Sequence, residues 1–130
     1  MIKRTPKVFR IVTPNVVYPQ DHEMATARIL AKTGDVEFLI PSRTAGAHTP
    51  DITWQSLDWE MKSPFGKSLR KVQDLLKRAL KQSRNIIFDG RNSKLSDEII
   101  VKELQRQVKL TRGIKRLIFI TKEGEIVDIK

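Results

Sequence analysis

The chain has 130 residues, of which 39% are hydrophobic, a size and composition typical of one domain with one core. Its 25 lysines and arginines outnumber its 15 aspartates and glutamates, and the formal charge of +10 favours an anionic partner such as nucleic acid, an acidic protein or a membrane surface. The lack of cysteine excludes disulfides, thiolate zinc sites and cysteine nucleophiles, and we find neither a signal peptide nor an apolar run long enough to span a membrane.

The first part of the chain is expected to be an N-terminal arm or linker over residues 1–20, ahead of a domain over residues 21–130. Three prolines interrupt the arm, and its only strand-like run is VFRIV at residues 8–12. From Asp21, a capping residue, apolar residues recur at helical spacing until Gly34 ends the predicted helix.

The next segments are predicted to be a buried strand, a loop and a hairpin. VEFLI at residues 36–40 is a continuous apolar run, and residues 41–50 are small and turn-forming. Residues 51–54 and 57–62 then alternate between polar and apolar on either side of Gln55-Ser56, as a half-buried hairpin does. A turn at Gln55-Ser56 makes both faces uniform, although this dipeptide is not a preferred two-residue turn and a looser loop is an alternative. The register that follows pairs Asp51 with Glu60, Ile52 with Trp59, Thr53 with Asp58 and Trp54 with Leu57.

The remaining segments continue the alternation of helices with apolar strands. They are a helix over residues 67–82, a strand over 85–89, a helix capped by Ser96, a strand over 116–121 and an edge strand over 125–129. Such an order predicts an α/β fold of one domain, in which a mixed sheet is flanked by helices on both faces.

The polar side of the hairpin carries the chemistry of interest. Asp51 and Glu60 would lie opposite each other, with β-carbons roughly 4.5–5.5 Å apart, and so repel each other unless a cation joins them. Mg²⁺ takes one or two protein carboxylates, and Lys62 points to the same side as Glu60, where it could hold a water that attacks a phosphate. The alternative is a solvated face of cross-strand salt bridges, and the pattern leaves both interpretations open.

The same residues resemble the signature of the PD-(D/E)XK nuclease superfamily. Pro50-Asp51 is followed, after eight residues, by Glu60-Met61-Lys62, and a helix with an acid, Glu23, precedes them. The resemblance implies a restriction-endonuclease-like core in which Glu23, Asp51 and Glu60 ligate a divalent metal. It further implies the Met61 carbonyl as an extra ligand and Lys62 as the catalytic lysine. The metal expected is Mg²⁺, with Mn²⁺ or Zn²⁺ as alternatives.

Longer blocks resemble the C-terminal tRNase domain of CdiA, the contact-dependent growth inhibition toxin. They are VEFLIPSRTAGAHTPDI, WEMKSPFGKS, ALKQSRNIIFDGR and IKRLIFITKEGEIVDI. This resemblance implies metal-dependent cleavage of tRNA, a cognate immunity protein as partner, and action in the cytoplasm of a target cell after delivery as part of a larger protein. One departure is Gly90, where relatives tend to carry a larger apolar residue, and we expect it to loosen the loop leading to Arg91.

Basic residues gather on and around the helix over residues 67–82, where they are expected to follow an RNA backbone. The alternative is the ordinary solvated side of an amphipathic helix. The nucleic-acid contacts predicted here and in the loop after the strand over 85–89 are Lys67, Arg70, Lys71, Lys81, Arg91 and Lys94. A second basic group comprises Lys109, Arg112, Lys115 and Arg116.

Other candidates have plainer interpretations. Trp54 and Trp59 could stack on bases, but their alternation with apolar residues favours a place in the core. His48 lies in the loop before the motif, where a histidine is usually just exposed to solvent. Two alternative functions stay open: a DNA nuclease of the same fold, from a mobile element or a repair system, and a non-catalytic nucleic-acid-binding module. A domain whose basic face binds an acidic protein is a third, weaker one.

Overall fold

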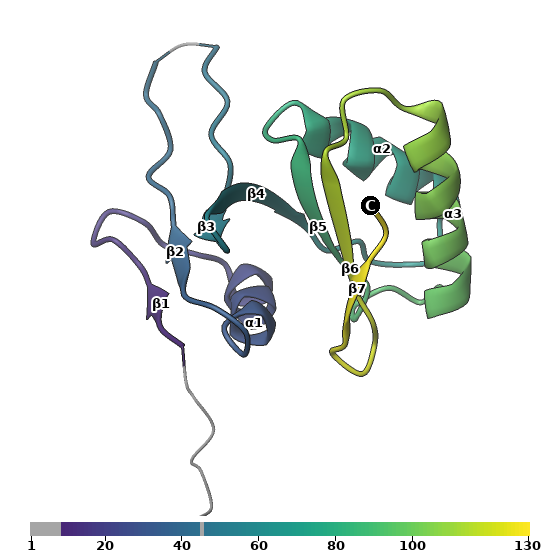
Figure 1. Cartoon of the computed structure of the whole chain (residues 1–130), viewed down its shortest axis with the longest axis horizontal. Coiled ribbons are helices and arrows are strands. Elements are labelled where there is room, and N and C mark those ends of the chain that lie inside the picture. The colour runs from purple at the N-terminus through teal and green to yellow at the C-terminus, as the bar shows by residue number, and fades with distance from the viewer. Residues whose placement is uncertain (1–8, 45) are drawn as a thin grey trace, which may run out of the picture.

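The computed structural model describes residues 9–44 and 46–130 and shows a seven-stranded sheet with three helices in that part of the chain (Figure 1). The strands are β1 (Ile11–Val12), β2 (Val36–Phe38), β3 (Ile52–Trp54), β4 (Leu57–Lys62), β5 (Asn85–Asp89), β6 (Arg116–Ile120) and β7 (Ile126–Asp128). The helices are α1 (Asp21–Leu30), α2 (Leu69–Leu80) and α3 (Asp97–Leu110). In the described part of the chain, every helix is too short or too polar to cross a membrane.

The sheet is mixed, as predicted, and its strands lie side by side in chain order from β1 to β7. β1 and β2 are parallel, β2, β3 and β4 run antiparallel to one another, β4, β5 and β6 are parallel, and β7 is antiparallel to β6. The predicted edge position of β7 is confirmed. The three parallel connections, β1 to β2, β4 to β5 and β5 to β6, pass through α1, α2 and α3, as parallel strands require a crossover.

Two hydrophobic clusters use alternate residues of the central strands. Ile87 of β5 packs with the residues of α1 and of the hairpin, whereas Ile86 and Phe88 pack with α2 and α3. Figure 1 accordingly shows α1 on one side of β5 and β6 and the other two helices on the opposite side. This two-sided burial explains why residues 86–88 of β5 and 117–120 of β6 are continuous apolar runs rather than alternating ones.

The helix ends follow local capping chemistry. The side chains of Ser68 and Ser96 accept hydrogen bonds from the backbone N–H groups of the third helical residues of α2 and α3. Asp21, predicted to cap α1, is instead its first residue, and the capping position belongs to Gln20. α1 ends at Leu30, earlier than the predicted stop at Gly34, where a β-carbon would lie 3.2 Å from Trp54 Nε1.

The hairpin forms with a tight two-residue turn. The ladder pairs Ile52 with Trp59, Thr53 with Asp58 and Trp54 with Leu57, as predicted. Gln55 and Ser56 both adopt positive φ, 51° and 63°, which a type I′ turn requires and which few residues other than glycine adopt easily. Both tryptophans are buried, and their indole N–H groups donate to backbone carbonyls, which confirms their place in the core.

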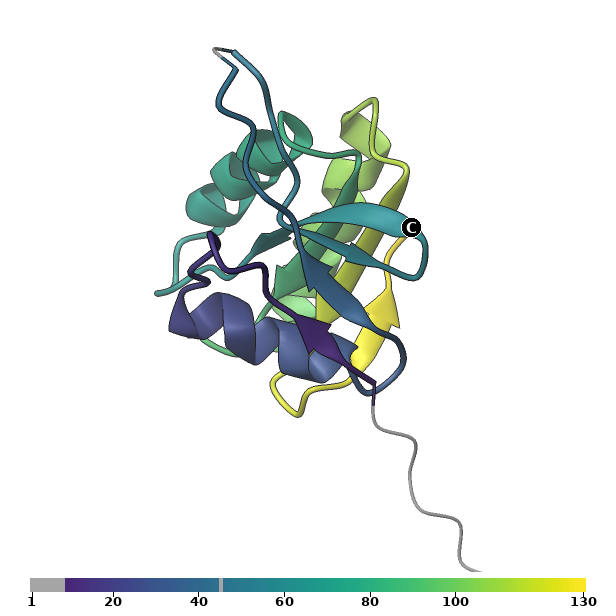
Figure 2. The ribbon, with the colours of Figure 1, turned by 90° about the vertical axis from the view of Figure 1, so that its left-hand side faces the viewer.

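The described part of the N-terminal arm lies against the domain. β1 pairs with β2, and the backbone N–H of Arg10 donates to the carboxylate of Asp35 at 2.8 Å. Ile11 and Val17 pack on the cluster that contains α1. Of the run VFRIV predicted as a strand, Val8 lies outside the described residues and only Ile11 and Val12 form the strand. Figure 2 shows this segment beside α1, with the loop between β2 and β3 extending away from the sheet.

The expectation that Gly90 loosens its loop is wrong. A β-carbon at this position would lie 2.5 Å from two ring atoms of Phe119, so glycine lets β5 and β6 end in close contact. The Gly90 N–H donates to the carbonyl of Ile120 at 2.9 Å, and its own carbonyl accepts from Lys122 Nζ at 2.9 Å. The loop leading to Arg91 is therefore held on both sides.

Candidate active site

The candidate site lies where β4 changes its pairing partner. Leu57 to Trp59 pair with β3, whereas Glu60 to Lys62 pair with β5. The hairpin ladder therefore ends at Ile52 and Trp59, and the predicted pair of Asp51 with Glu60 is not part of it. The Asp51 N–H instead donates to the Trp59 carbonyl at 2.9 Å, because the two strands separate at this point.

The separation of the strands leaves backbone groups that a side chain must satisfy. Asp51 Oδ2 accepts a hydrogen bond from the Met61 N–H at 2.8 Å, which takes the place of a strand-to-strand bond. This contact fixes the direction of the Asp51 carboxylate relative to β4. Asp51 and Glu60 thus lie close together as expected. What places Asp51 beside β4 is its side-chain bond to the Met61 N–H, not the predicted pairing of Asp51 with Glu60.

A cavity of about 300 Å³ at the fork contains all four predicted catalytic residues. Glu23 reaches it from the first turn of α1, where Oε1 accepts from the Gln20 N–H at 2.9 Å. The lining residues are Gln20, His22, Glu23, Asp51, Glu60, Met61, Lys62, Ser63 and Leu75. An acid in the first turn also stabilises the N-terminus of a helix, and for Glu23 that role is compatible with a place in the site.

Glu60 is the most perturbed group of the cavity. Its residue is 5% exposed, and its Oε1 atom is buried without a hydrogen-bond partner among the described residues. The pKa of Glu60 is raised from 4.5 to about 8, chiefly by burial of the carboxylate and further by the negative charge of Asp51 and by the hydrogen bond that a protonated Glu60 can donate to it. Lys62 Nζ, 3.3 Å from Glu60 Oε2, opposes this rise without reversing it.

This arrangement fits a hard divalent cation. A buried carboxylate oxygen without a donor is unfavourable unless a proton or a cation satisfies it. Asp51 and Glu60 are ligands of the type that Mg²⁺ prefers, and Mg²⁺ completes its shell with waters and substrate oxygens. Within residues 9–44 and 46–130, no three Asp, Glu or His side chains converge closely enough to hold an ion by themselves. Glu23 lines the cavity but is not close enough to Asp51 and Glu60 to form a three-carboxylate group with them.

The two histidines are placed differently. His22 lines the cavity and contacts the ring of Phe65 edge-on, with ring centroids 6.2 Å apart. His22 precedes Glu23 in the first turn of α1, and both residues line the cavity. His48 is exposed and does not line the cavity, in agreement with its plainer interpretation.

Five of the six residues predicted to contact nucleic acid are exposed, and the sixth, Arg91, is not. The side chains of Lys67, Arg70, Lys71, Lys81 and Lys94 are exposed, and none of them lines the cavity. Arg91 is instead half-buried, and its Nε and Nη2 donate to the Asp89 carboxylate at 3.0 and 2.8 Å. Its guanidinium is therefore engaged within the fold rather than presented like the exposed lysines.

Asp89 is a buried carboxylate that sequence reasoning missed. Besides Arg91, it accepts from Thr26 Oγ1 at 2.6 Å, which ties α1 to the end of β5. Burial by itself raises the pKa of Asp89, but the hydrogen bonds from Arg91 and Thr26 outweigh it and hold the pKa below its usual value. Thr26 lies one helical turn after Glu23, so this contact fixes the helix that carries Glu23. An acid that ends an apolar strand was the available signal.

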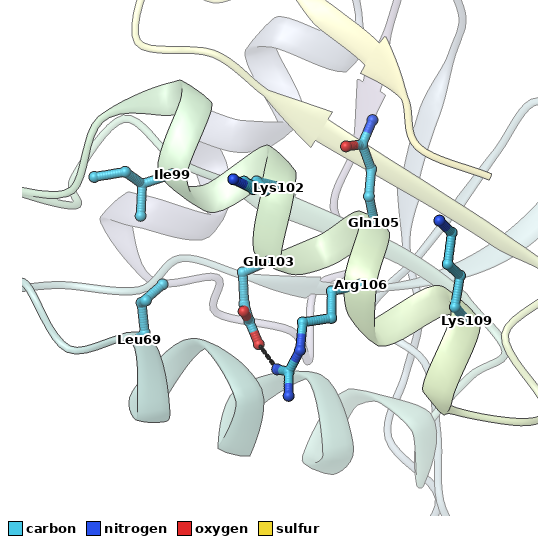
Figure 3. Close-up of a pocket in the computed structure, with 7 residues that line it drawn as sticks. All are labelled: Leu69, Ile99, Lys102, Glu103, Gln105, Arg106 and Lys109. Carbon is cyan, nitrogen blue, oxygen red and sulfur yellow. Dashed lines mark hydrogen bonds and ion pairs between the residues drawn. The ribbon is translucent and has the colours of Figure 1, made fainter.

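A larger cavity, of about 510 Å³, lies away from these carboxylates between α2 and α3 (Figure 3). Its wall includes Glu103, which accepts from Gln73, Gln107 and Arg106 at 2.7 to 3.0 Å. Burial raises the pKa of Glu103, but these hydrogen bonds and the charge of Arg106 outweigh it and lower the pKa. Glu103 has its partners within the fold, so its role is to join the two helices.

Comparison with known proteins points to one family. The family described as "Contact-dependent growth inhibition CdiA C-terminal domain" matches residues 48–126, a span that includes Asp51, Glu60 and Lys62 but not Glu23. A chain in the solved "CdiA-CT/CdiI toxin and immunity complex from Burkholderia pseudomallei" is similar in fold, with a TM-score of 0.67 and 18% sequence identity. The match covers 93% of this chain and 98% of that chain. Among curated proteins, none matches this sequence.

Proposed function

This chain belongs to the contact-dependent growth inhibition CdiA C-terminal domain family, and we propose that it is a toxin nuclease that cleaves tRNA with the help of a divalent metal. One observation carries the proposal: the buried, unpartnered oxygen of Glu60 lies in a cavity with Asp51 and Lys62. A fold that keeps such a group buried at a free-energy cost needs a reason for it, and a bound cation is one.

The proposed core is that of the PD-(D/E)XK nucleases. What supports it is the order of a helix with an acid, an antiparallel hairpin and parallel strands, together with the motif residues at the fork of β4. Asp51 stands just before β3 and Glu60 just after the point where β4 leaves β3. The two halves of the motif therefore meet although eight residues separate them.

We propose that the carboxylates of Asp51 and Glu60 bind the cation. Glu23, from α1, and the Met61 carbonyl are the additional ligands. Mg²⁺ is the expected ion, and Mn²⁺ or Zn²⁺ are alternatives. When bound, such a cation polarises a phosphate and stabilises the charge that develops on it. The bond from the Met61 N–H keeps Asp51 oriented toward the cavity, so its geometry does not depend on substrate.

Lys62 has two roles in this proposal. Its ammonium group partly compensates the crowded carboxylates, as its 3.3 Å contact with Glu60 indicates. It also has donors with which to hold the attacking water beside the scissile phosphate. The exposed lysines and arginines of α2 supply the attraction for the RNA backbone, which depends on charge and not on base sequence.

The family also suggests the partner and the place of action. We infer that a cognate immunity protein blocks this toxin, since the structurally similar chain comes from a toxin–immunity complex. We further infer that the domain acts in the cytoplasm of a target cell after delivery as part of a larger protein. The basic charge of +10 suits both tRNA and an acidic inhibitor.

The test is to incubate the purified protein with total bacterial tRNA and with plasmid DNA, each with Mg²⁺, Mn²⁺, Zn²⁺ or EDTA. We expect metal-dependent cleavage of tRNA that Lys62→Ala abolishes without unfolding the protein. Cleavage of DNA alone would replace the proposal by a DNA nuclease of the same fold. Binding of either nucleic acid without cleavage under any condition would instead favour a non-catalytic module.

A further inference from the structure

A second cavity adjoins the candidate active site. It has a volume of about 230 Å³ and lies between the N-terminal segment, the end of β2 and the loop before β3. Glu23 and Asp51 line both this cavity and the one at the fork. The two cavities are therefore neighbours that share a wall of carboxylates.

We propose that this second cavity binds one unstacked nucleobase of the substrate, next to the phosphate that is cleaved. The inference rests on the proposed nuclease function, to which it adds a subsite for substrate recognition. Because the two cavities share Glu23 and Asp51, a nucleotide chain with its phosphate at the fork can place an adjacent base in the second cavity without leaving the surface.

The walls of the cavity suit a base better than a phosphate. They are mainly apolar, with Val17 from the N-terminal segment, Phe38 from β2 and Pro50 from the loop. Among the described residues that line it, none is a lysine or an arginine, and the only charged ones are the two carboxylates. A phosphate would be repelled there, whereas a neutral base loses water favourably against apolar walls.

Tyr18 is the residue that gives the cavity its specificity for a planar ring. It is 87% exposed although it is aromatic, and it is the single tyrosine of the chain. Exposed aromatic rings stack on unpaired bases, and such stacking tolerates any base because each has a π-face. The volume is below the roughly 300–1,000 Å³ common for small-molecule pockets, which limits the occupant to about one base.

A further consequence concerns the form of the RNA. A base can enter the cavity only when it is not stacked in a helix, so the subsite selects a loop, a bulge or an end. We therefore expect the bond that is cut to lie in an unpaired region of its substrate.

The experiment uses the Lys62→Ala protein, so that the RNA stays intact, and a single-stranded RNA with one 2-aminopurine, whose fluorescence falls on stacking. With Mg²⁺ present, we expect quenching at one position. Adding Tyr18→Ala should remove the quenching and weaken binding about fivefold or more, as loss of one stacked base does. Tyr18→Phe should keep both. Ile40→Ala is the matched control, since Ile40 is 58% exposed nearby but does not line the cavity.

The subsite would be overturned if Tyr18→Ala showed the same quenching and affinity as the Lys62→Ala parent. It would also be overturned if Ile40→Ala lost as much quenching and affinity as Tyr18→Ala. Because this readout is binding, its result is separate from that of the cleavage assay. If the wild type cleaves RNA and Tyr18→Ala cleaves it at the same rate and the same sites, the nuclease function is supported and the subsite is refuted. Tyr18-dependent quenching in a protein that cuts nothing would support base binding and refute the nuclease.

Discussion

Replacing Glu60 by glutamine removes a buried negative charge and keeps the shape of the side chain. In the wild type this carboxyl has a pKa of about 8 in the folded state, against 4.5 ordinarily. Between these two values the folded protein binds more protons than the unfolded chain does. The free energy of unfolding therefore falls as the pH rises from 4.5 through 8, and glutamine, which cannot ionise, escapes this loss.

The size of the effect follows from the same difference. At about 1.36 kcal/mol per pH unit, the loss cannot exceed roughly 5 kcal/mol, reached above the folded pKa. Water that enters the cavity relaxes the charge and reduces the figure, so we expect about 2–4 kcal/mol. Without divalent metal, Glu60→Gln should thus be more stable than the wild type at pH 9, and this advantage should nearly vanish at pH 5.

The assay is urea unfolding in EDTA at pH 5, 7 and 9, followed by the fluorescence of Trp54 and Trp59. These are the only two tryptophans of the chain, and both are buried. Asp58→Asn is the matched control, because it removes an exposed carboxylate from the same strand, and it should follow the wild-type curve. Adding Mg²⁺ should stabilise the wild type more than Glu60→Gln, since ligand binding to the folded state adds to stability.

Parallel pH curves for Glu60→Gln and the wild type would refute the reasoning. They would mean that Glu60 is hydrated in the folded protein and that its unpartnered oxygen is not a buried charge. A lower stability of Glu60→Gln at pH 9 would show that the contact with Lys62 outweighs burial and the repulsion by Asp51. Either result would remove the electrostatic reason for placing a cation at the fork.

Three other predictions concern the residues around the site. Asp89→Asn should cost about 2–4 kcal/mol at pH 7 by urea unfolding, because it leaves a partly buried guanidinium without its partner. The lowered pKa of Asp89 stabilises the fold above the ordinary value of 3.8, and this contribution is lost as the pH falls through the folded pKa. The wild type should therefore lose more stability than Asp89→Asn on acidification to pH 2; equal losses would contradict the shift. Gly90→Ala should cost about 1–3 kcal/mol in thermal unfolding through overpacking on Phe119, and Phe119→Leu should recover part of it; additive costs would exclude the clash. Replacing Lys71 and Lys81 by glutamine should make the dependence of tRNA affinity on salt less steep, by about 0.7 in the logarithmic slope for each contact with single-stranded RNA; an unchanged slope would place the RNA elsewhere.

Much of the fold could be predicted because its signals are local. Ser96 caps the helix that follows it, as predicted, and the strand over 85–89 has the predicted bounds. The alternation from Ile52 to Trp59 fixed the register of the hairpin, since a slip by one residue would turn both tryptophans to solvent. The turn at Gln55-Ser56 was less certain from its residues, because its positive φ angles are imposed by the strands on either side.

The candidate site was predicted as a set of residues but not as a geometry. Asp51, Glu60 and Lys62 were identified by a motif, and their meeting in one cavity needed the fork at which β4 passes from β3 to β5. Nothing within a few residues of Glu60 indicates that one of its oxygens lacks a partner, because burial is decided by all the elements around it.

Side-chain contacts made in the folded chain account for the remaining differences. Arg91 was expected to face a phosphate, yet its partner is the Asp89 carboxylate, which also holds Thr26, 63 residues away in sequence. Gly90 was expected to loosen a loop, yet the ring of Phe119 requires it. By itself, the sequence determined most of the elements, their amphipathic faces and the motif of the candidate site, since these depend on neighbours along the chain. Only the tertiary structure decided which polar groups have partners and which do not, because side chains brought together from separate elements compete for the same hydrogen bonds and space.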